Sequence, residues 1–347
     1  MRKICGNQMR HYLTQYIVII VLSISSIFSQ AVSKTGTSSG QFLKIGVGSR
    51  AIGLGGAFTA IADDASSLYW NPSGIAKNKT LSVLVDHYDW ILDIEMDYIG
   101  VIIPLGSVGN LGISTNYLHM GEMEVTSTKN PEGTGEKFSA ASYLGQISYA
   151  KNLTERFSLG SSIKLIKESI WNSAATGVAI DIGTLYDSKF PGLKLGMSIS
   201  NYGSKMKMDG RDLLVQTDLD PSLESDPENL NSNLMTDEFD LPMIFRFGMS
   251  FAKKLKNGFG TIVAIDAIHP SDNTESINIG TELNYNNIGF IRFGYRNLFK
   301  RDLEQKLSIG CGIALNYKNI KYHIDYSYTD FDILGSPQKL TITFVLR

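Results

Sequence analysis

Hydrophobic and polar residues alternate along the last third of the chain. Between positions 306 and 317, one set of alternate residues is hydrophobic or aromatic, and it comprises Leu307, Ile309, Cys311, Ile313, Leu315 and Tyr317. The residues between them are mostly small or polar. The same alternation runs through 320–329 and 338–347, and only Lys318 and Asn319 separate the first two segments. Because successive side chains of a strand point to opposite faces, this period of two predicts strands whose faces meet different environments.

The same period predicts fourteen strands from residue 80 onward. We place them at 80–90, 94–104, 108–118, 138–150, 155–168, 176–186, 192–201, 241–252, 258–268, 275–285, 288–297, 306–317, 320–329 and 338–347. Each is close to the roughly 9–11 residues that a tilted strand needs to cross the hydrocarbon core of a bilayer. An even number of such strands is typical of closed barrels in bacterial outer membranes, where no sheet edge is left unpaired.

The gaps between the predicted strands fall into two length classes. Every second gap is short, and these gaps are 105–107, 151–154, 187–191, 253–257, 286–287 and 318–319. The others are mostly longer, with 119–137 and 202–240 as the extremes and 91–93 as the exception. Outer-membrane barrels have short periplasmic turns and long external loops. We therefore predict a 14-stranded antiparallel transmembrane β-barrel over 80–347, and we prefer it to a soluble β-sandwich, which gives no reason for this sorting.

In several predicted strands the charged residues fall on the face opposite the apolar one. The predicted outward faces, for example Val178, Ile180 and Ile182, carry no charge. A Lys or Arg facing lipid at the bilayer midplane would cost ~2–4 kcal/mol. The opposite faces carry the candidate lumen charges, which are Lys164, Asp181, Arg246, Asp266, Glu282, Arg292, Arg296 and Asp325. We expect these groups to pair with each other and with a plug; the sharper alternative is that they guide a substrate.

The first 30 residues have the features of a secretory signal peptide. Arg2, Lys3 and Arg10 precede an uncharged run at 16–28, and Ser29 and Ala31 offer a small-x-small cleavage pattern. The alternative, a retained anchor, needs roughly 20 apolar residues, which is more than this run provides. After cleavage only Cys311 would remain, so we expect no internal disulfide. This export signal and the barrel pattern together predict the outer membrane, with its lipid and lipopolysaccharide as surroundings.

The segment 31–79 lies ahead of the first predicted strand, and its residues 42–79 do not alternate. This segment is dense in Gly and Ala, and Gly53, Gly55 and Gly56 would allow close approach to a barrel wall. Asp63 or Asp64 is placed to cap a short helix from Ala65, and Pro72 ends what precedes it. We therefore predict a plug, or hatch, that lies inside the lumen.

Composition and motifs exclude several classes of function. The formal net charge is -2 and no basic patch is interleaved with aromatic residues, so we expect no nucleic-acid partner. Gly46, Gly48 and Ala51 formally match the dinucleotide fingerprint, but no βαβ unit surrounds them, and we expect no cofactor. No catalytic motif or His/Cys metal spacing occurs, so we predict neither an enzyme nor a zinc site. A calcium site near Asp218, Asp220 and Asp226 in the acidic loop 202–240 is left open, with a solvated loop as the plainer alternative.

The segment from Ser49 to Gly74 carries a resemblance to a known family. Its first part runs through Gly53, Gly55 and Gly56 to Asp63 and Asp64, and its second contains Tyr69, Trp70, Asn71, Pro72, Ser73 and Gly74. The run resembles the N-terminal signature of the PorV/PorQ family, relatives of the FadL-type outer-membrane transporters. Asn71 to Gly74 is similar to the Asn-Pro-Ala-Gly element of the FadL-type hatch, with Ser73 in place of Ala. The resemblance implies a 14-stranded, FadL-like barrel with an N-terminal hatch.

The resemblance also implies a function. Members of the PorV type serve type IX secretion by receiving secreted proteins through C-terminal signal domains, whereas FadL-type relatives admit hydrophobic small molecules. We expect the first role, a non-enzymatic component that binds cargo or secretion partners, and keep the second as the alternative. The candidate hatch or ligand residues are Gly53, Gly55, Gly56, Asp63, Asp64, Tyr69, Trp70, Asn71, Pro72 and Gly74. Tyr69 and Trp70 are the first to test for a hydrophobic ligand.

Overall fold

The structure is a computed structural model, and it describes residues 34–217, 230–298, 300, 307–331 and 335–346. The expected signal peptide and the acidic residues of the possible calcium site lie outside the described residues. Fourteen long strands form the wall. They are β1 (Ser82–Asp89), β2 (Ile94–Pro104), β3 (Asn110–Met120), β6 (Ala140–Asn152), β7 (Phe157–Ile170), β8 (Ser173–Asp187), β9 (Leu193–Gly203), β15 (Ile244–Lys254), β16 (Phe259–Pro270), β17 (Ser276–Tyr285), β18 (Gly289–Leu298), β19 (Leu307–Tyr317), β20 (Ile320–Thr329) and β21 (Gln338–Leu346).

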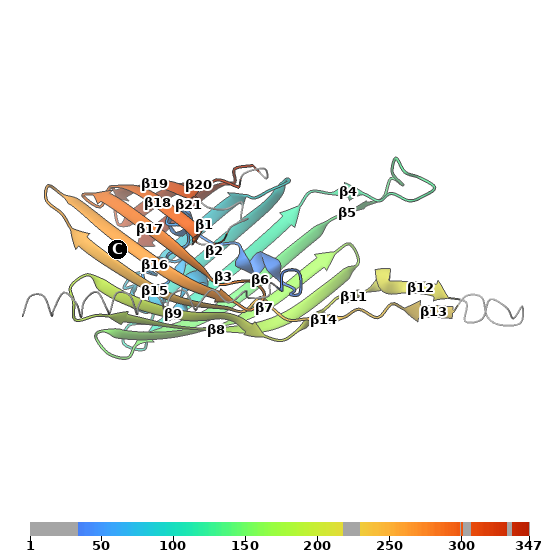
Figure 1. Cartoon of the computed structure of the whole chain (residues 1–347), viewed down its shortest axis with the longest axis horizontal. Coiled ribbons are helices and arrows are strands. Elements are labelled where there is room, and N and C mark those ends of the chain that lie inside the picture. Colours follow the sequence, from blue (N-terminus) through green and yellow to red (C-terminus); the bar gives the residue numbers. More distant parts are fainter. Residues whose placement is uncertain (1–33, 218–229, 299, 301–306, 332–334, 347) are drawn as a thin grey trace, which may run out of the picture.

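The strands close into a barrel. Each pairs antiparallel with its neighbour in the chain, and β1 pairs both with β2 and with the last strand, β21, for example at Val85 and Ile342. Figure 1 shows the strands lying side by side at a common tilt. Closure leaves neither β1 nor β21 as an open edge, which is what a sheet in a hydrocarbon environment requires. The predicted 14-stranded antiparallel barrel is confirmed.

The strand boundaries differ from the predicted ones at several ends. The largest difference lies between β7 and β8, where pairing continues to Ile170 and Ser173 and leaves the two-residue turn 171–172. The sequence placed a longer loop, 169–175, here. Trp171 takes the left-handed backbone conformation with φ 50°, which is uncommon for a bulky residue, so alternation alone does not indicate a tight turn at this point. A second connection at the long-loop end of the barrel is therefore short, besides 90–93.

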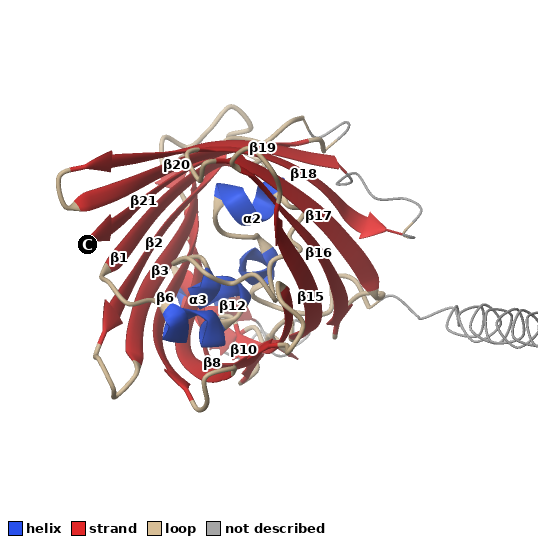
Figure 2. Ribbon diagram, turned by 90° about the vertical axis from the view of Figure 1, so that its left-hand side faces the viewer, coloured by secondary structure: helices blue, strands red, loops and turns tan. Residues whose placement is uncertain are grey.

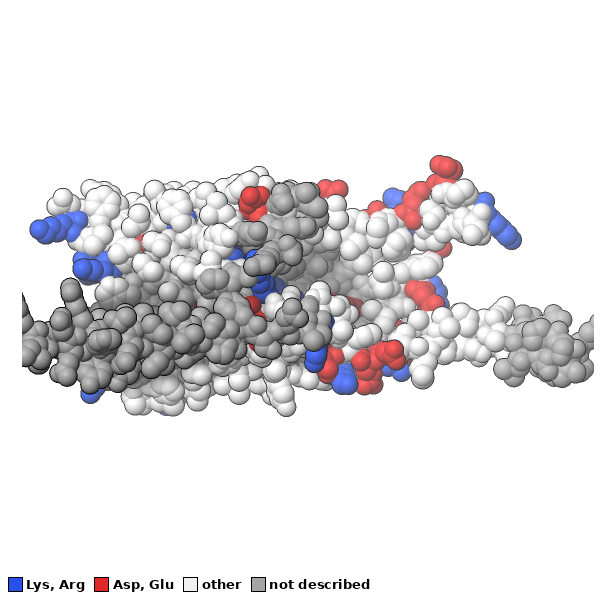
Figure 3. All heavy atoms as spheres, in the orientation of Figure 1, with Lys and Arg blue, Asp and Glu red and all other residues white. Residues whose placement is uncertain are grey.

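The outer face of the wall is apolar. Val178, Ile180 and Ile182 on β8 are exposed there, and so are Met249 and Phe251 on β15, two strands away, as the alternation predicted. On the face shown in Figure 3, uncharged residues cover most of the described wall, and charged side chains lie mainly towards its two ends, including the loops at the right. No helix within the described residues is long and apolar enough to span a membrane.

The segment before β1 lies inside the barrel. It contains four short helices, which are η1 (Gln41–Lys44), α2 (Ser49–Gly53), α3 (Ser67–Trp70) and η2 (Pro72–Lys77). Figure 2, along the barrel, shows α2 and α3 enclosed by the ring of strands. The main hydrophobic core joins plug residues such as Phe58 and Leu68 to inward-facing wall residues such as Tyr98. The plug, rather than the wall alone, therefore completes the core.

The plug contains the predicted short helix, but the helix begins later than predicted. Helix α3 begins at Ser67, with Ser66 as its N-cap, and not at Ala65. Asp64 accepts the backbone N–H of Ser66 at 2.9 Å, so it forms a turn before the helix and does not cap it. Asn71 is extended, with φ -162° and ψ 102°, because the following Pro72 disfavours the helical region.

Two loops at the long-loop end contain short strands. One hairpin pairs β4 (Met123–Glu124) with β5 (Lys137–Phe138). In the loop between β9 and β15, β10 (Met206–Lys207) pairs with β14 (Glu238–Phe239), β12 (Leu214–Thr217) pairs with β13 (Leu230–Asn233), and the loop also holds β11 (Asp209–Gly210) and η3 (Arg211–Leu213). Figure 1 shows both loops reaching well beyond the barrel rim. The sequence assigned these segments to loops without strands.

Candidate functional site in the barrel lumen

Asn71 joins the plug to the wall. Its side-chain amide donates to the carbonyl oxygens of Thr59 in the plug, at 2.9 Å, and Thr184 on β8, at 3.0 Å. Its Oδ1 accepts from the hydroxyl of Ser73 at 2.7 Å. Pro72 and Asn71 also lie directly on two wall glycines, since a Cβ on Gly160 would be 2.5 Å from Pro72 and one on Gly183 would be 2.0 Å from Asn71. The hatch element therefore fits a groove that only glycine leaves open.

The glycines of the signature allow close packing in two places, against the barrel wall and within the plug. A Cβ on Gly53 would be 3.0 Å from the backbone of Gly310, and one on Gly55 would be 2.8 Å from the backbone of Tyr295, so these two residues touch the wall. Gly56 instead faces the ring of Trp70 and the side chain of Asn278, at 3.1 Å and 3.2 Å. Gly74 packs within the plug, against Ala62.

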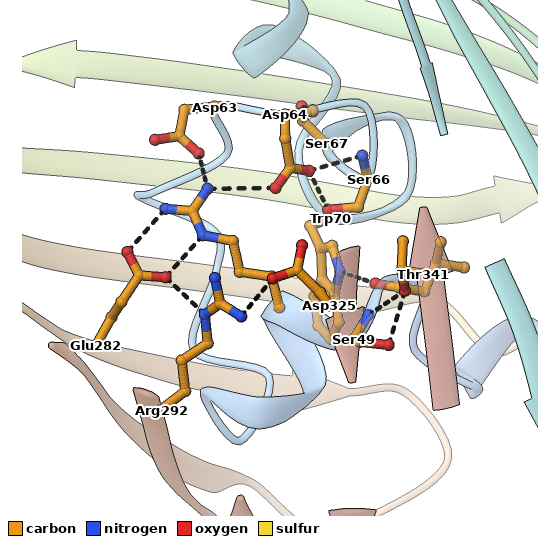
Figure 4. A network of polar contacts seen from close by, with 12 residues as sticks. Ser49, Asp63, Asp64, Ser66, Ser67, Trp70, Glu282, Arg292, Asp325 and Thr341 are labelled. Carbon is orange, nitrogen blue, oxygen red and sulfur yellow. Dashed lines mark hydrogen bonds and ion pairs between the residues drawn. The ribbon is translucent and has the colours of Figure 1, made fainter. Parts of the chain in front are cut away.

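Arg50 connects the plug to a buried ion-pair network. Its Nε lies 2.9 Å from Glu282, which also receives Nε of Arg292 at 2.7 Å, and Arg292 reaches Asp325 at 2.6 Å (Figure 4). The three wall residues come from β17, β18 and β20 and are almost completely buried. Buried charges need partners, and here the expected partners are present. The three wall residues were predicted to lie in the lumen, but Arg50 was not predicted as their partner. It could have been noticed as a charged residue in a segment that is otherwise dense in Gly and Ala.

Asp63 and Asp64 complete the network from the plug side. Arg50 Nη1 lies 2.6 Å from Asp63 and 3.3 Å from Asp64. Asp64 also accepts from the hydroxyl of Ser66 at 2.6 Å. Both carboxylates therefore hold the same guanidinium that reaches Glu282, which ties the turn before α3 to the α2 side chain.

A second buried network holds the plug at the β1–β21 seam. Lys339 Nζ lies 2.9 Å from Asp86 and 2.6 Å from the carbonyl oxygen of Gly46. Asp86 also accepts the backbone N–H of Gly48 at 3.0 Å. Asp86 and Lys339 were not among the predicted lumen charges. Both lie at inward positions of their strands, so the alternation of polar and hydrophobic residues could have identified them.

Three further predicted lumen charges, Lys164, Asp181 and Asp266, hold either a strand bulge or the plug backbone. Lys164 pairs with Asp181 at 2.6 Å, and Asp181 accepts the backbone N–H of Asn201, which sits at a register shift with φ 63°. Asp266 accepts two plug amides, those of Phe58 at 3.0 Å and Thr59 at 2.9 Å. Each of these carboxylates therefore supports a strained or unpaired piece of backbone.

A cavity of about 520 Å³ separates the plug from one side of the wall. Plug residues, the ends of β1, β15, β16, β17 and β18, and the adjoining loops line it, and the lining comprises Gln41, Lys44, Ile45, Gly46, Ile52, Tyr69, Trp70, Tyr88, Trp90, Ile244, Arg246, Ile268, Pro270, Asn273, Ser276, Asn278, Arg296, Asn297 and Lys300. Of the predicted site residues, Tyr69, Trp70, Arg246 and Arg296 meet here. Lys44, Tyr88, Trp90 and Lys300 were not predicted, because they come from three segments that are distant in the sequence.

The N-terminal part of the plug crosses the long-loop end of the barrel beside this cavity. Asp272, in the loop after β16, accepts from Ser38 at 2.6 Å, Gln41 at 3.0 Å and Lys44 at 2.8 Å. Burial disfavours the ionised carboxyl, but the hydrogen bonds from Lys44, Ser38 and Gln41 outweigh it and lower the pKa of Asp272 to about 2. Residues 38–44 thus form a strap that is fastened by an ionised carboxylate.

Comparison with known proteins assigns the family. The family described as "Type IX secretion system protein PorV" matches residues 28–221, which is more than half of the chain. The matched region includes the plug, with Arg50 and Asn71, and the first seven wall strands. The chain belongs to the PorV family. No curated protein matches it.

Solved structures with this fold are outer-membrane transporters. The Ralstonia pickettii toluene transporter TbuX is 11% identical with a TM-score of 0.53, over 87% of this chain and 98% of TbuX. The Pseudomonas putida toluene transporter TodX is 12% identical with a TM-score of 0.52, over 86% of this chain and 96% of TodX. At these identities the likeness shows the fold alone, a FadL-like barrel. Membership of the PorV family carries the function, a component of type IX secretion in the outer membrane.

Proposed function

We propose that this PorV-family barrel is a non-enzymatic binding component that receives secreted proteins, or other secretion proteins, at its long-loop end. The observation that carries the proposal is the family match over residues 28–221, which contains the whole hatch signature. The expected outer-membrane surroundings, lipid and lipopolysaccharide, follow from the apolar outer wall.

The loops support a binding role. The hairpins β4–β5 and β12–β13 reach beyond the rim of the barrel (Figure 1). In the longer loop Leu214, Met235 and Phe239 are exposed hydrophobic residues, with 89% of Met235 accessible. Exposed hydrophobic side chains next to charged ones are typical of surfaces that contact proteins. The plug supports the same role, because two buried ion-pair networks and the Asn71 contacts hold it in the lumen.

The test is capture of a defined cargo by the full chain in detergent. A secreted protein with its C-terminal signal domain should bind, and the same protein without that domain should not. Replacing 123–138 with a short turn should weaken capture, whereas altering the short turn 255–258 at the other end should not. A barrel that purifies alone and captures neither form of the cargo would contradict the proposal.

The second candidate function is transport of a hydrophobic small molecule. The cavity between plug and wall favours it, because Tyr69 and Trp70 present aromatic rings to this partly open space. Mass spectrometry of the protein purified from its own membranes tests it. A bound apolar compound that is lost when Trp70 is replaced by Ala would support transport, and an empty cavity would remove the main support.

A further inference from the structure

Arg246 on β15 differs from the other buried cations of the lumen. Only 4% of its surface is exposed, and its Nη1 donates to the hydroxyl of Ser200 at 3.1 Å. Its Nε has no hydrogen-bond partner, and no carboxylate of the described residues lies within ion-pair distance. By contrast, Lys164, Arg292 and Lys339 are each paired with a carboxylate. Burying a cation without a counter-charge costs free energy. The described part of the protein therefore does not neutralise the charge of Arg246 with an ion pair.

The neighbouring carboxylates are already engaged. Asp181 holds Lys164, and Asp266 holds the amides of Phe58 and Thr59. Besides the Ser200 hydroxyl, two rings compensate Arg246 in part, because its guanidinium carbon lies 5.7 Å from the ring centre of Tyr69 and 5.5 Å from that of Trp70. Cation–π contacts recover only part of the cost of taking a guanidinium out of water. A ligand anion would supply the rest.

The cavity that Arg246 lines has the matching composition. Tyr88 and Trp90 add two further rings, packed edge to face with their centres 5.0 Å apart. Arg296 and Lys300 add positive charge, Lys44 adds an ammonium group that is paired with Asp272, and the amides of Asn273, Asn278 and Asn297 add donors. The described lining contains no Asp or Glu. The cavity therefore presents cations and donors together with aromatic walls, a combination that suits a molecule with one anionic and one apolar end.

We propose that this cavity binds an organic carboxylate: the carboxylate pairs with Arg246, and an aromatic or apolar group joined to it packs against Trp70, Tyr88 and Trp90. The volume of about 520 Å³ lies within the range of small-molecule sites. A neutral hydrocarbon would fill the aromatic part but leave Arg246 without a counter-charge. This chemistry occurs in free organic acids and at the C-terminal residue of a polypeptide. The inference does not depend on the secretion role.

The first test uses the full chain in detergent and two probes of similar shape. Phenylacetate carries the carboxylate and toluene lacks it. In isothermal titration calorimetry, phenylacetate should bind saturably and at least about ten-fold more tightly than toluene, the gain typical of a charge-assisted hydrogen bond. In the Trp171→Phe background, where Trp70 and Trp90 are the remaining tryptophans, it should also change the tryptophan fluorescence. Equal affinity for both probes, or no binding of phenylacetate, would overturn the proposal.

The second test uses variants that separate charge from shape. Arg246→Met should weaken phenylacetate binding at least about ten-fold, and Arg246→Lys should retain part of the affinity because it retains the charge. Arg156→Met is the matched control, since Arg156 is exposed in the turn before β7, and it should bind as the parent does. Heat-modifiable migration on gels verifies that each barrel is folded.

Should Arg246→Met not fold, Trp90→Ala at the end of β1 is the second variant, and it should weaken phenylacetate binding as well. Parent-like affinity in the folded variant would overturn the assignment.

A third measurement distinguishes the two sources of the carboxylate. A short peptide with a C-terminal Phe and a free carboxylate should compete with phenylacetate if the cavity accepts a polypeptide end, and the amidated peptide should not. Competition by the free acid alone assigns a polypeptide C-terminus, whereas failure of both peptides, with phenylacetate still bound, assigns a free organic acid. Competition by both peptides would contradict the role of the carboxylate. Cargo capture by the loops is a separate measurement, so either result can fail without the other.

Discussion

Replacing Asn71 with Ala tests how the plug is held. The side chain is fully buried and makes contacts to Thr59, Thr184 and Ser73. Removing it leaves two carbonyl oxygens and the Ser73 backbone N–H without these partners. At about 1 kcal/mol for each lost hydrogen bond, and more where the partner stays buried, we expect docking of the plug to weaken by ~3–5 kcal/mol. The strand ladders do not involve the side chain, so the barrel should remain folded.

Hydrogen–deuterium exchange of peptides from 49–77 measures the docking. Since each 1.4 kcal/mol is a factor of ten, exchange in the variant should be faster by roughly two to four powers of ten. Heat-modifiable migration on gels measures the barrel separately. Asn130→Ala, in the exposed β4–β5 loop, is the control and should exchange as the parent does. Asn71→Asp removes the same two donors and should be at least as damaging.

Two results would refute this reasoning. Parent-like exchange in Asn71→Ala would mean that the contacts of the hatch element contribute little. Loss of heat-modifiable migration would mean that the segment is part of the frame of the barrel and is not a docked plug. Pro72→Ala should behave like a weaker form of Asn71→Ala, because it removes the ring carbon Cδ that packs against Gly183 but no hydrogen bond.

The remaining predictions concern the groove, the strap and the wall. Gly183→Ala should destabilise plug docking by ~1–3 kcal/mol through overpacking, measured by the same exchange, whereas Gly145→Ala, with open space at the Cβ position, should not. Because the pKa of Asp272 is lowered to about 2, its carboxylate should hold the strap above about pH 4 and release it only as pH falls through about 2; Asp272→Asn should increase exchange of 38–44 at neutral pH, and an unchanged strap would contradict the role of the charge. Ile163→Lys, on the outer wall at the middle of β7, should cost ~2–4 kcal/mol in refolding into bilayers, measured by urea titration, and no cost would argue against a lipid-facing position.

The barrel was readable from the sequence, because a strand between lipid and a filled lumen must alternate. Residues such as Ile309 and Cys311 had to face outward if Ser308 and Gly310 faced inward. This local rule placed fourteen strands with errors of a few residues at their ends. It failed at the β7–β8 turn, because Trp171 holds a left-handed conformation that its residue type does not indicate.

The site was only partly readable. Alternation identified Glu282 and Arg292 as lumen groups, and the Gly-rich signature indicated close packing. The partners were not readable, because Arg50 reaches Glu282 across 232 positions of sequence and Lys339 reaches Asp86 across 253. Strand register and the course of the plug inside the closed barrel determine which inward positions meet.

The sequence by itself determined the period of the strands, their number, the apolar outer wall and the family, since each is written in neighbouring residues. The tertiary structure alone decided where the plug lies, which charges are paired, and that no carboxylate among the described residues pairs with Arg246 beside the aromatic cavity. The physical reason is that burial and pairing are properties of groups brought together from distant strands by barrel closure, whereas alternation is a property of each strand.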